Sequence, residues 1–130
     1  MLFRSAAANN AIVTGDVKAT EGNATITATE GSADVDANVE AGQKALITAN
    51  TNATVAGEVK AGSDATIEAG KDAEVSGKVT AQNNAGVTAG EDAKVTGNIT
   101  ATDGNASIAA GANADVQGGV PPPDRRYGAN

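Results

Sequence analysis

Carboxylates are the main side chains in this chain that could do acid–base or metal chemistry. The sequence has 16 Asp and Glu residues but no histidine and no cysteine, so the commonest general base and the usual zinc ligands are missing. Asp34 and Asp36 are two residues apart, while Asp64, Asp72 and Asp92 each end a short polar run that begins with glycine. These are ordinary outward and corner positions, which favours a solvated acidic surface over catalysis. We therefore expect no enzymatic activity, no metal and no cofactor.

Calcium and nucleic acid are also disfavoured as ligands. Calcium-binding β-rolls repeat a glycine- and aspartate-rich nonapeptide, and this motif is missing from the sequence. Nine basic against 16 acidic residues give a net charge of −7, and only 2% of the residues are aromatic. A nucleic-acid site needs basic side chains for the phosphates and rings for stacking, so we expect no nucleic-acid partner.

A sequence repeat determines the architecture that positions these groups. The segment AEVSGKVTA at residues 73–81 returns as AKVTGNITA at 93–101, and such regular spacing is typical of a solenoid. Small apolar residues occupy every second position of each copy, which indicates strands with one buried face. Short runs rich in Gly, Asp and Asn separate the strands and predict corners.

Each repeat predicts one coil of an all-β fold, a triangular and by general precedent right-handed parallel β-helix. About five to six coils of about 20 residues each are expected. Alanine should fill much of the interior, since three strands that face one axis leave little room for large side chains. Three columns of β-branched residues should form the rest of the core: Ile26, Ile47, Ile67, Val87 and Ile108; Val13, Val35, Val55, Val75, Val95 and Val116; Val17, Val39, Val59, Val79, Ile99 and Val120.

The repeats predict one β-helix domain over residues 11–120 between two tails. Residues 1–10 form the expected N-terminal tail. Residues 121–130 begin with three prolines, which lack the N–H donor of a β-ladder, so we expect the rod to stop near Val120 and this C-terminal tail to be extended or disordered. No apolar stretch has the length of a membrane span, and the first ten residues lack the apolar run of a secretory signal. The cytoplasm is therefore the expected location.

The ends of the rod are the first candidate interaction surface. An end coil exposes unpaired backbone N–H and C=O groups, which natural solenoids normally cover with a cap, and no cap is evident in the sequence. We expect copies of the chain to polymerise end to end, without nucleotide. The expected junction residues are Val13, Val17, Val116 and Val120.

The second candidate surface is the outward face beside the Ile26 column. It is nearly neutral, with Glu68 as its one charge in five coils, whereas the other two faces carry several charges each. A flat, weakly charged face of this kind favours lateral contact between copies; a plain solvated face and a face that binds carbohydrate or ice are the alternatives. The residues expected to make the contact are Thr25, Leu46, Thr48, Thr66 and Thr88.

The repeats also resemble those of a known family. Residues 53–61, 73–81 and 93–101 follow the pattern A-x-V-x-G-x-V/I-x-A and look like the units of bactofilins, which are bacterial cytoskeletal proteins. The resemblance covers roughly residues 11–120 and both tails, and implies a β-helix that polymerises end to end without nucleotide. In some members the N-terminal tail associates with membrane, and Leu2, Phe3 and Arg4 resemble such a tail; a merely disordered start is the alternative.

The match to bactofilins has two departures. Bactofilin coils are typically shorter and richer in Val and Ile, and the Ala-Gly-x-Asp-Ala corners found here also resemble repeats of filamentous haemagglutinin-like secreted adhesins. The sequence predicts a self-assembling structural protein, most similar to a bactofilin scaffold, whose main partner is itself. An extracellular fibre or adhesin solenoid is one alternative. A monomeric binding module that uses the threonine-bearing face is the other.

Overall fold

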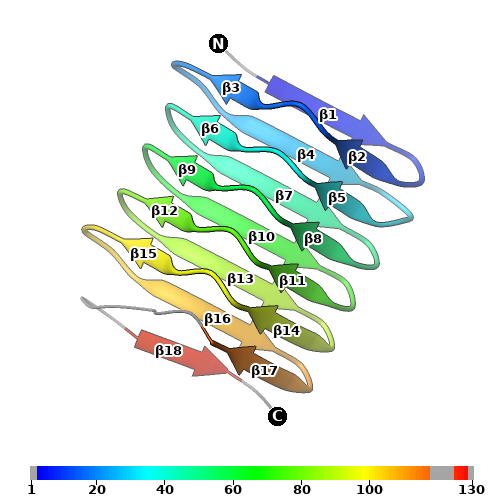
Figure 1. Cartoon of the computed structure of the whole chain (residues 1–130), viewed down its shortest axis with the longest axis vertical. Helices are drawn as coiled ribbons and strands as arrows, with labels where there is room; N and C mark the ends of the chain where they lie inside the picture. Colours follow the sequence, from blue (N-terminus) through cyan, green and yellow to red (C-terminus); the bar gives the residue numbers. More distant parts are fainter. Residues whose placement is uncertain (1–2, 118–124, 129–130) are drawn as a thin grey trace.

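The computed structural model describes residues 3–117 and 125–128, and every element in this part of the chain is a β-strand. The strands form three parallel sheets, here named A, B and C (Figure 1). Sheet A consists of β1 (Phe3–Ala7), β4 (Ala24–Ala28), β7 (Ala45–Ala49), β10 (Ala65–Ala69), β13 (Ala85–Ala89), β16 (Ala106–Ala110) and β18 (Arg125–Gly128). Sheet B consists of β2 (Ala11–Val13), β5 (Ala33–Val35), β8 (Ala53–Val55), β11 (Ala73–Val75), β14 (Asp92–Val95) and β17 (Asn113–Val116). Sheet C consists of β3 (Val17–Ala19), β6 (Val39–Ala41), β9 (Val59–Ala61), β12 (Val79–Ala81) and β15 (Ile99–Ala101).

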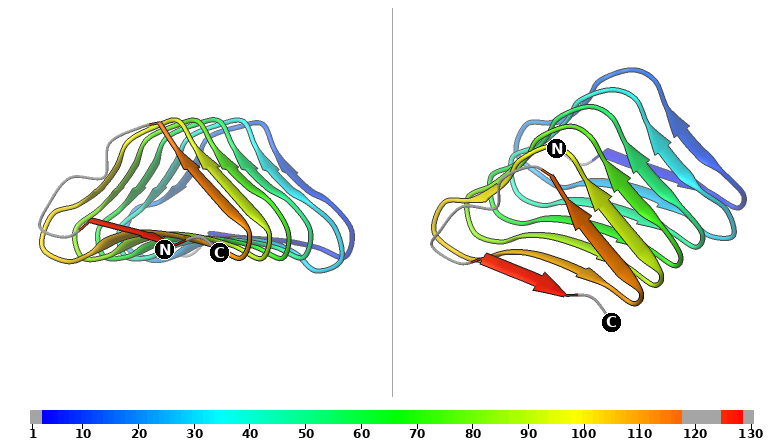
Figure 2. Two further views of the ribbon diagram at one scale, coloured as in Figure 1. Left: turned by 90° about the horizontal axis from the view of Figure 1, so that it is seen from below. Right: turned by 60° about the horizontal axis from the view of Figure 1, so that its bottom comes forward.

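The chain passes from sheet A to B to C and then starts the next coil on sheet A. Neighbouring strands in each sheet therefore belong to successive coils, and the chain forms about five coils of about 20 residues each. Seen along its length, the solenoid has a flat base made of sheet A and two sloping sides made of sheets B and C (Figure 2). The predicted fold class, an all-β solenoid of parallel strands, is confirmed.

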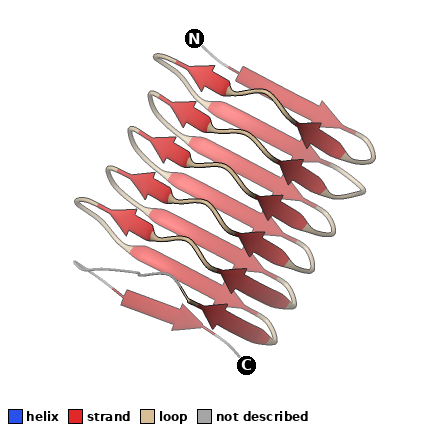
Figure 3. Cartoon of the chain, viewed as in Figure 1, coloured by secondary structure: helices blue, strands red, loops and turns tan. Residues whose placement is uncertain are grey.

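The alternation of small apolar and polar residues determines which segments form strands. In the middle coils, residues of the Ala-x-Ile-x-Ala and Ala-x-Val type place the small apolar residues inward and the polar ones outward. The register keeps like residues together, with Ile67 opposite Ile47 and Val87, and Val75 opposite Val55 and Val95. Short corners and bends separate the strands, so the ribbon alternates between strand and loop along each coil (Figure 3).

The core consists of alanine, valine and isoleucine in stacked columns. The three predicted columns are buried through the inner coils, with Ile26, Ile47 and Ile67 at 0% exposure, whereas Val116 is only partly buried. Ala65, Ala69, Ala73 and Ala81, predicted as interior, are buried as well. Full burial stabilises a Val or Ile by about 1.5–3 kcal/mol and an alanine by less, so the backbone ladders between coils must contribute much of the order. Among the described residues no polar side chain is buried, and none leaves a buried polar atom without a partner.

Both predicted tails need correction. The N-terminal segment supplies β1, whose residues Phe3 to Ala7 pair with Ala24 to Ala28, and the C-terminal segment supplies β18, which pairs with β16. The solenoid thus extends beyond residues 11–120 at both ends. The reason is that a parallel ladder uses backbone groups, which Arg125 to Gly128 possess although the preceding prolines do not. Val120 and the prolines lie outside the described residues.

Candidate functional site: the two ends of the solenoid

Three edge strands form the N-terminal end of the solenoid. They are β1, β2 and β3, each of which pairs with one neighbour among the described residues. The first coil is nevertheless well packed, because Val13 and Val17 of β2 and β3 are only 8% and 3% exposed. Val13 and Val17, two of the four predicted junction residues, therefore lie at this end, but their side chains are largely covered and their backbone groups bond to the following coil.

The backbone groups of β2 have a defined direction. Ala11 donates its N–H to the carbonyl of Ser32, and Val13 accepts the N–H of Asp36, both at 2.9 Å and both in the following coil. In a parallel strand the intervening residue directs its N–H and C=O to the opposite side. Ile12 therefore presents both groups at the open N-terminal end. Its side chain, 66% exposed, is the one large hydrophobic side chain that is clearly exposed within residues 8–117.

The C-terminal end has complementary features. Its outermost described strands are β18, β17 and β15 in sheets A, B and C. In β17 the inward residues Ala114 and Val116 are only partly buried, whereas Ala93 and Val95, their register partners in β14, are 1% and 0% exposed. The core is thus open at this end. Val116 was predicted here; Val120 lies outside the described residues.

A ladder of Asn and Asp side chains links the corners that precede sheet B. In this ladder a side-chain oxygen of one coil accepts the backbone N–H of the equivalent residue in the next coil. Asp72 bonds to Asn52 in this way, Asp92 to Asp72 and Asn113 to Asp92, at 3.4, 3.3 and 3.2 Å. At the first coil, Asn10 accepts the N–H of Ser32 at 2.9 Å. Bonds of this kind therefore occur in the first coil and again from Asn52 to the last described coil.

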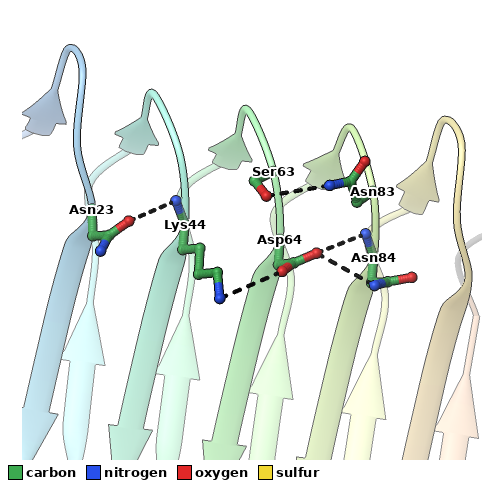
Figure 4. Close-up of polar contacts among 6 residues, drawn as sticks. All are labelled: Asn23, Lys44, Ser63, Asp64, Asn83 and Asn84. Atoms are coloured by element: carbon green, nitrogen blue, oxygen red, sulfur yellow. Dashed lines mark hydrogen bonds and ion pairs between the residues drawn. The ribbon is translucent and has the colours of Figure 1, made fainter.

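The corner that precedes sheet A has a similar ladder (Figure 4). Lys44 donates its N–H to Asn23 at 3.1 Å, and Asn84 donates its N–H to Asp64 at 3.2 Å. The side chain of Lys44 has no oxygen that could accept an N–H of the next coil. Its ammonium lies 3.9 Å from the Asp64 carboxylate, so an ion pair continues the contact between coils. The corner aspartates predicted as a plain solvated surface therefore make hydrogen bonds between coils.

The outward face of sheet A carries the residues predicted to make lateral contacts. Thr25, Leu46, Thr48 and Thr66 are half-buried among their neighbours on strands β4, β7 and β10, and Thr88 of β13 is exposed. They lie on one flat sheet, the base of the solenoid in Figure 2. The structure brings these residues together on one face, and their lateral contact with a second copy stays a prediction.

Two shallow grooves interrupt the surface. One, of about 240 Å³, follows the corner between sheets C and A past Thr20, Gly42, Gly62, Gln82 and Thr102. The other, of about 290 Å³, lies over β13, where Gly86 replaces the side chain that other coils carry. Within residues 3–117 and 125–128 no group of three or more acidic residues could hold a metal ion. Glu40 and Lys60 also line the first groove, but no buried polar side chain among the described residues lines either one.

The predicted membrane tail is placed differently by the structure. Phe3 and Arg4 belong to β1, where they are the register partners of Ala24 and Thr25, so they are not part of a free tail; Leu2 lies outside the described residues. In the part of the chain that the structure describes, no helix has the length and apolarity to span a bilayer. Membrane association through these three residues stays a prediction.

Comparisons with known proteins name no relative. The chain matches no protein-family model, no curated protein and no solved structure. The resemblance to bactofilins and the weaker one to secreted adhesins therefore rest on the repeat residues alone. Functional inference has to start from the ends and faces of the solenoid.

Proposed function

We propose that the protein is a structural, self-assembling protein whose copies stack end to end into a filament. The observation that carries the proposal is the open C-terminal end, where Ala114 and Val116 leave the apolar core partly exposed. A second coil stacked on β17 would bury these residues as β14 is buried in the middle of the solenoid. Since no nucleotide takes part in this contact, assembly would need none.

The two ends fit each other through sheet B. Ala114 and Val116 occupy the register column of Ala11 and Val13, so their N–H and C=O groups point away from β14. Ile12 of a second copy presents its own N–H and C=O in the opposite direction. Each hydrogen bond formed across this junction would contribute about 0.5–1.5 kcal/mol.

The corner ladder supports the same head-to-tail register. Asn113 lies in the column of Asp92, Asp72 and Asn52, and it is the last member of this column among the described residues. Asn10 of a stacked copy would occupy the next position of this column. Its side-chain oxygen already accepts the N–H of Ser32 at 2.9 Å. The ladder of one copy can therefore continue into the next without a change of residue type.

The finer statement of this proposal is a bactofilin-like cytoskeletal scaffold in the cytoplasm. It is supported by the A-x-V-x-G-x-V/I-x-A units and by the end geometry just described. Lateral contact through the flat face of sheet A, which carries Thr25, Leu46, Thr48, Thr66 and Thr88, would then bundle filaments. The outward side of the five inner strands of that sheet, where Glu68 is the one charged residue, supports this arrangement, because like charges would otherwise repel.

Two variants of Ile12 test the junction. Ile12→Pro removes an N–H that points to the open end, and proline is tolerated in an edge strand, so the monomer should fold. Ile12→Thr is the matched control, which loses the exposed apolar side chain and keeps the N–H. Sedimentation over a concentration series should show polymer for the wild type and Ile12→Thr and mainly monomer for Ile12→Pro, with equal circular dichroism. Equal polymer for all three would refute the junction.

A further inference from the structure

The chain contains one more strand in sheet A than in sheet B. It begins on sheet A with β1, before the first strand of sheet B, and it ends on sheet A with β18, after the last strand of sheet B (Figure 1). Among the described residues sheet A thus has seven strands and sheet B six. This excess has a consequence for stacking. If β17 of one copy pairs with β2 of the next, β1 of the next copy arrives beside β16, where β18 already lies.

The register shows that β1 and β18 fit the same position. Phe3 is the partner of Ala24, and Arg125 is the partner of Ala106. Ala24 and Ala106 belong to one column, which continues through Ala45, Ala65 and Ala85. Two strands with the same register on the same sheet cannot occupy one site at once.

We propose that β18 is an intramolecular occupant of the site that takes β1 of a second copy, and that assembly exchanges β18 for this strand. The inference rests on the proposed end-to-end stacking and adds its regulation. While β18 pairs with β16, sheet B of two copies cannot join without a clash in sheet A. Release of β18 frees β16 for the incoming β1 and allows sheets A and B to continue from one copy to the next.

The connections indicate which strand yields. β1 leads into β2 through three residues, and Ala8 in this corner accepts the N–H of Glu30 at 2.8 Å. β18 follows β17 after residues 117–124, of which three are prolines without an N–H. β1 also pairs over five residues, whereas β18 pairs over four. The exchange therefore replaces a shorter ladder with a longer one.

A reversible disulfide tests the exchange in the full-length chain, which has no cysteine of its own. Ser107 and Arg126 are register partners in β16 and β18, and the spacing of neighbouring strands suits a disulfide. Ser107→Cys/Arg126→Cys should stay monomeric when oxidised and assemble when reduced. The matched control is Glu74→Cys/Lys94→Cys, an exposed pair of register partners inside sheet B, which should assemble in both states.

A second pair of variants tests the effect of weakening the pairing of β18 with β16, which the disulfide locks. Arg126 lies in the register column of Ser107, whose N–H groups point to the preceding coil. Arg126→Pro therefore removes an N–H that is directed to β16, and Arg126→Thr keeps this N–H. Arg126→Pro should lower the concentration needed for assembly by about tenfold, the effect of one lost hydrogen bond in β18, and Arg126→Thr should not.

The outcomes separate this inference from the proposed function. Equal assembly of the oxidised and reduced Ser107→Cys/Arg126→Cys chains overturns the exchange and leaves end-to-end stacking in place. Absence of polymer in the wild type, the reduced chain and Arg126→Pro at every concentration overturns both. Sedimentation of each chain with and without reductant decides between these results.

Discussion

Asn113 donates two hydrogen bonds to a single carboxylate oxygen of Asp92, one from its backbone N–H at 3.2 Å and one from its side-chain amide at 3.0 Å. Asp92 in turn donates its own N–H to Asp72 at 3.3 Å. The pair is the last described step of a ladder that joins successive coils at one corner. A side chain that looks like an ordinary surface aspartate therefore contributes to the order between coils.

Removal of this acceptor should loosen the last coil. We expect Asp92→Ala to destabilise the protein by about 0.5–1.5 kcal/mol, because the two donors of Asn113 then depend on water. Asp92→Asn keeps an oxygen at the same place and should change stability little. Thermal unfolding followed by circular dichroism gives the comparison. Equal midpoints for Asp92→Ala and Asp92→Asn would show that the ladder contributes nothing.

The bend between sheets B and C depends on close approach of successive coils. A Cβ atom on Gly97 would overlap the carbonyl oxygen of Gly77 and approach two further backbone atoms, whereas a Cβ on Gly15, at the same bend of the first coil, would meet nothing within 4 Å. We expect Gly97→Ala to cost about 1–3 kcal/mol, and Gly15→Ala to be neutral or slightly stabilising. Urea unfolding of the two variants measures this difference, and similar losses for both would contradict it.

Neighbouring residues on β7 should differ sharply in their contribution to stability. Ile47 is fully buried in its column, while the adjacent Leu46 faces outward and is half-buried. Ile47→Ala should destabilise by about 2–5 kcal/mol, since it leaves a cavity in a tightly packed core. Leu46→Ala should cost much less. Denaturant midpoints of the monomeric chains test the pair, and a larger loss for Leu46→Ala would reverse the assigned faces.

The groove over β13 predicts a stabilising substitution. Gly86 occupies an outward strand position, and a Cβ added there would meet only the hydroxyl of Ser107, at 3.6 Å. Threonine suits a half-buried strand better than glycine, so Gly86→Thr should raise stability by about 0.5–1 kcal/mol. A higher thermal midpoint than that of the wild type is the expected result. A lower midpoint would mean that the groove serves a purpose other than packing.

The core could be predicted because its pattern is strictly local. Alternation in units such as residues 73–81 marks each inward side chain, and the 20-residue spacing brings Ile47, Ile67 and Val87 into register without knowledge of any long-range contact. The buried alanines follow from the same pattern, since three strands around one axis exclude larger residues.

The two terminal strands could not be predicted from that pattern. β1 has Phe3 and Ser5 where the inner strands of sheet A have Ala and Ile, and β18 has Arg125 and Tyr127 at the same register positions. Both pair through the backbone, which no side-chain motif reveals. The spacing of Tyr127 from Ile108, one residue short of the repeat, was the available signal.

The direction of the edge groups is a second feature that the sequence left hidden. Val13, Val17 and Val116 were predicted as junction residues because they end apolar columns. The structure adds that Ile12 faces the open end with its backbone, because its neighbours Ala11 and Val13 both bond to the following coil. Sequence alternation identifies the inward face but does not say which ladder a given N–H joins.

Electron microscopy of the purified wild-type chain over a range of concentrations tests the central claim most directly. The account predicts unbranched filaments a single solenoid wide, with coils stacked at about 4.8 Å along the filament axis, and their loss in Ile12→Pro. A chain that remains monomeric at all concentrations, both as wild type and when β18 is weakened by Arg126→Pro, would contradict end-to-end assembly.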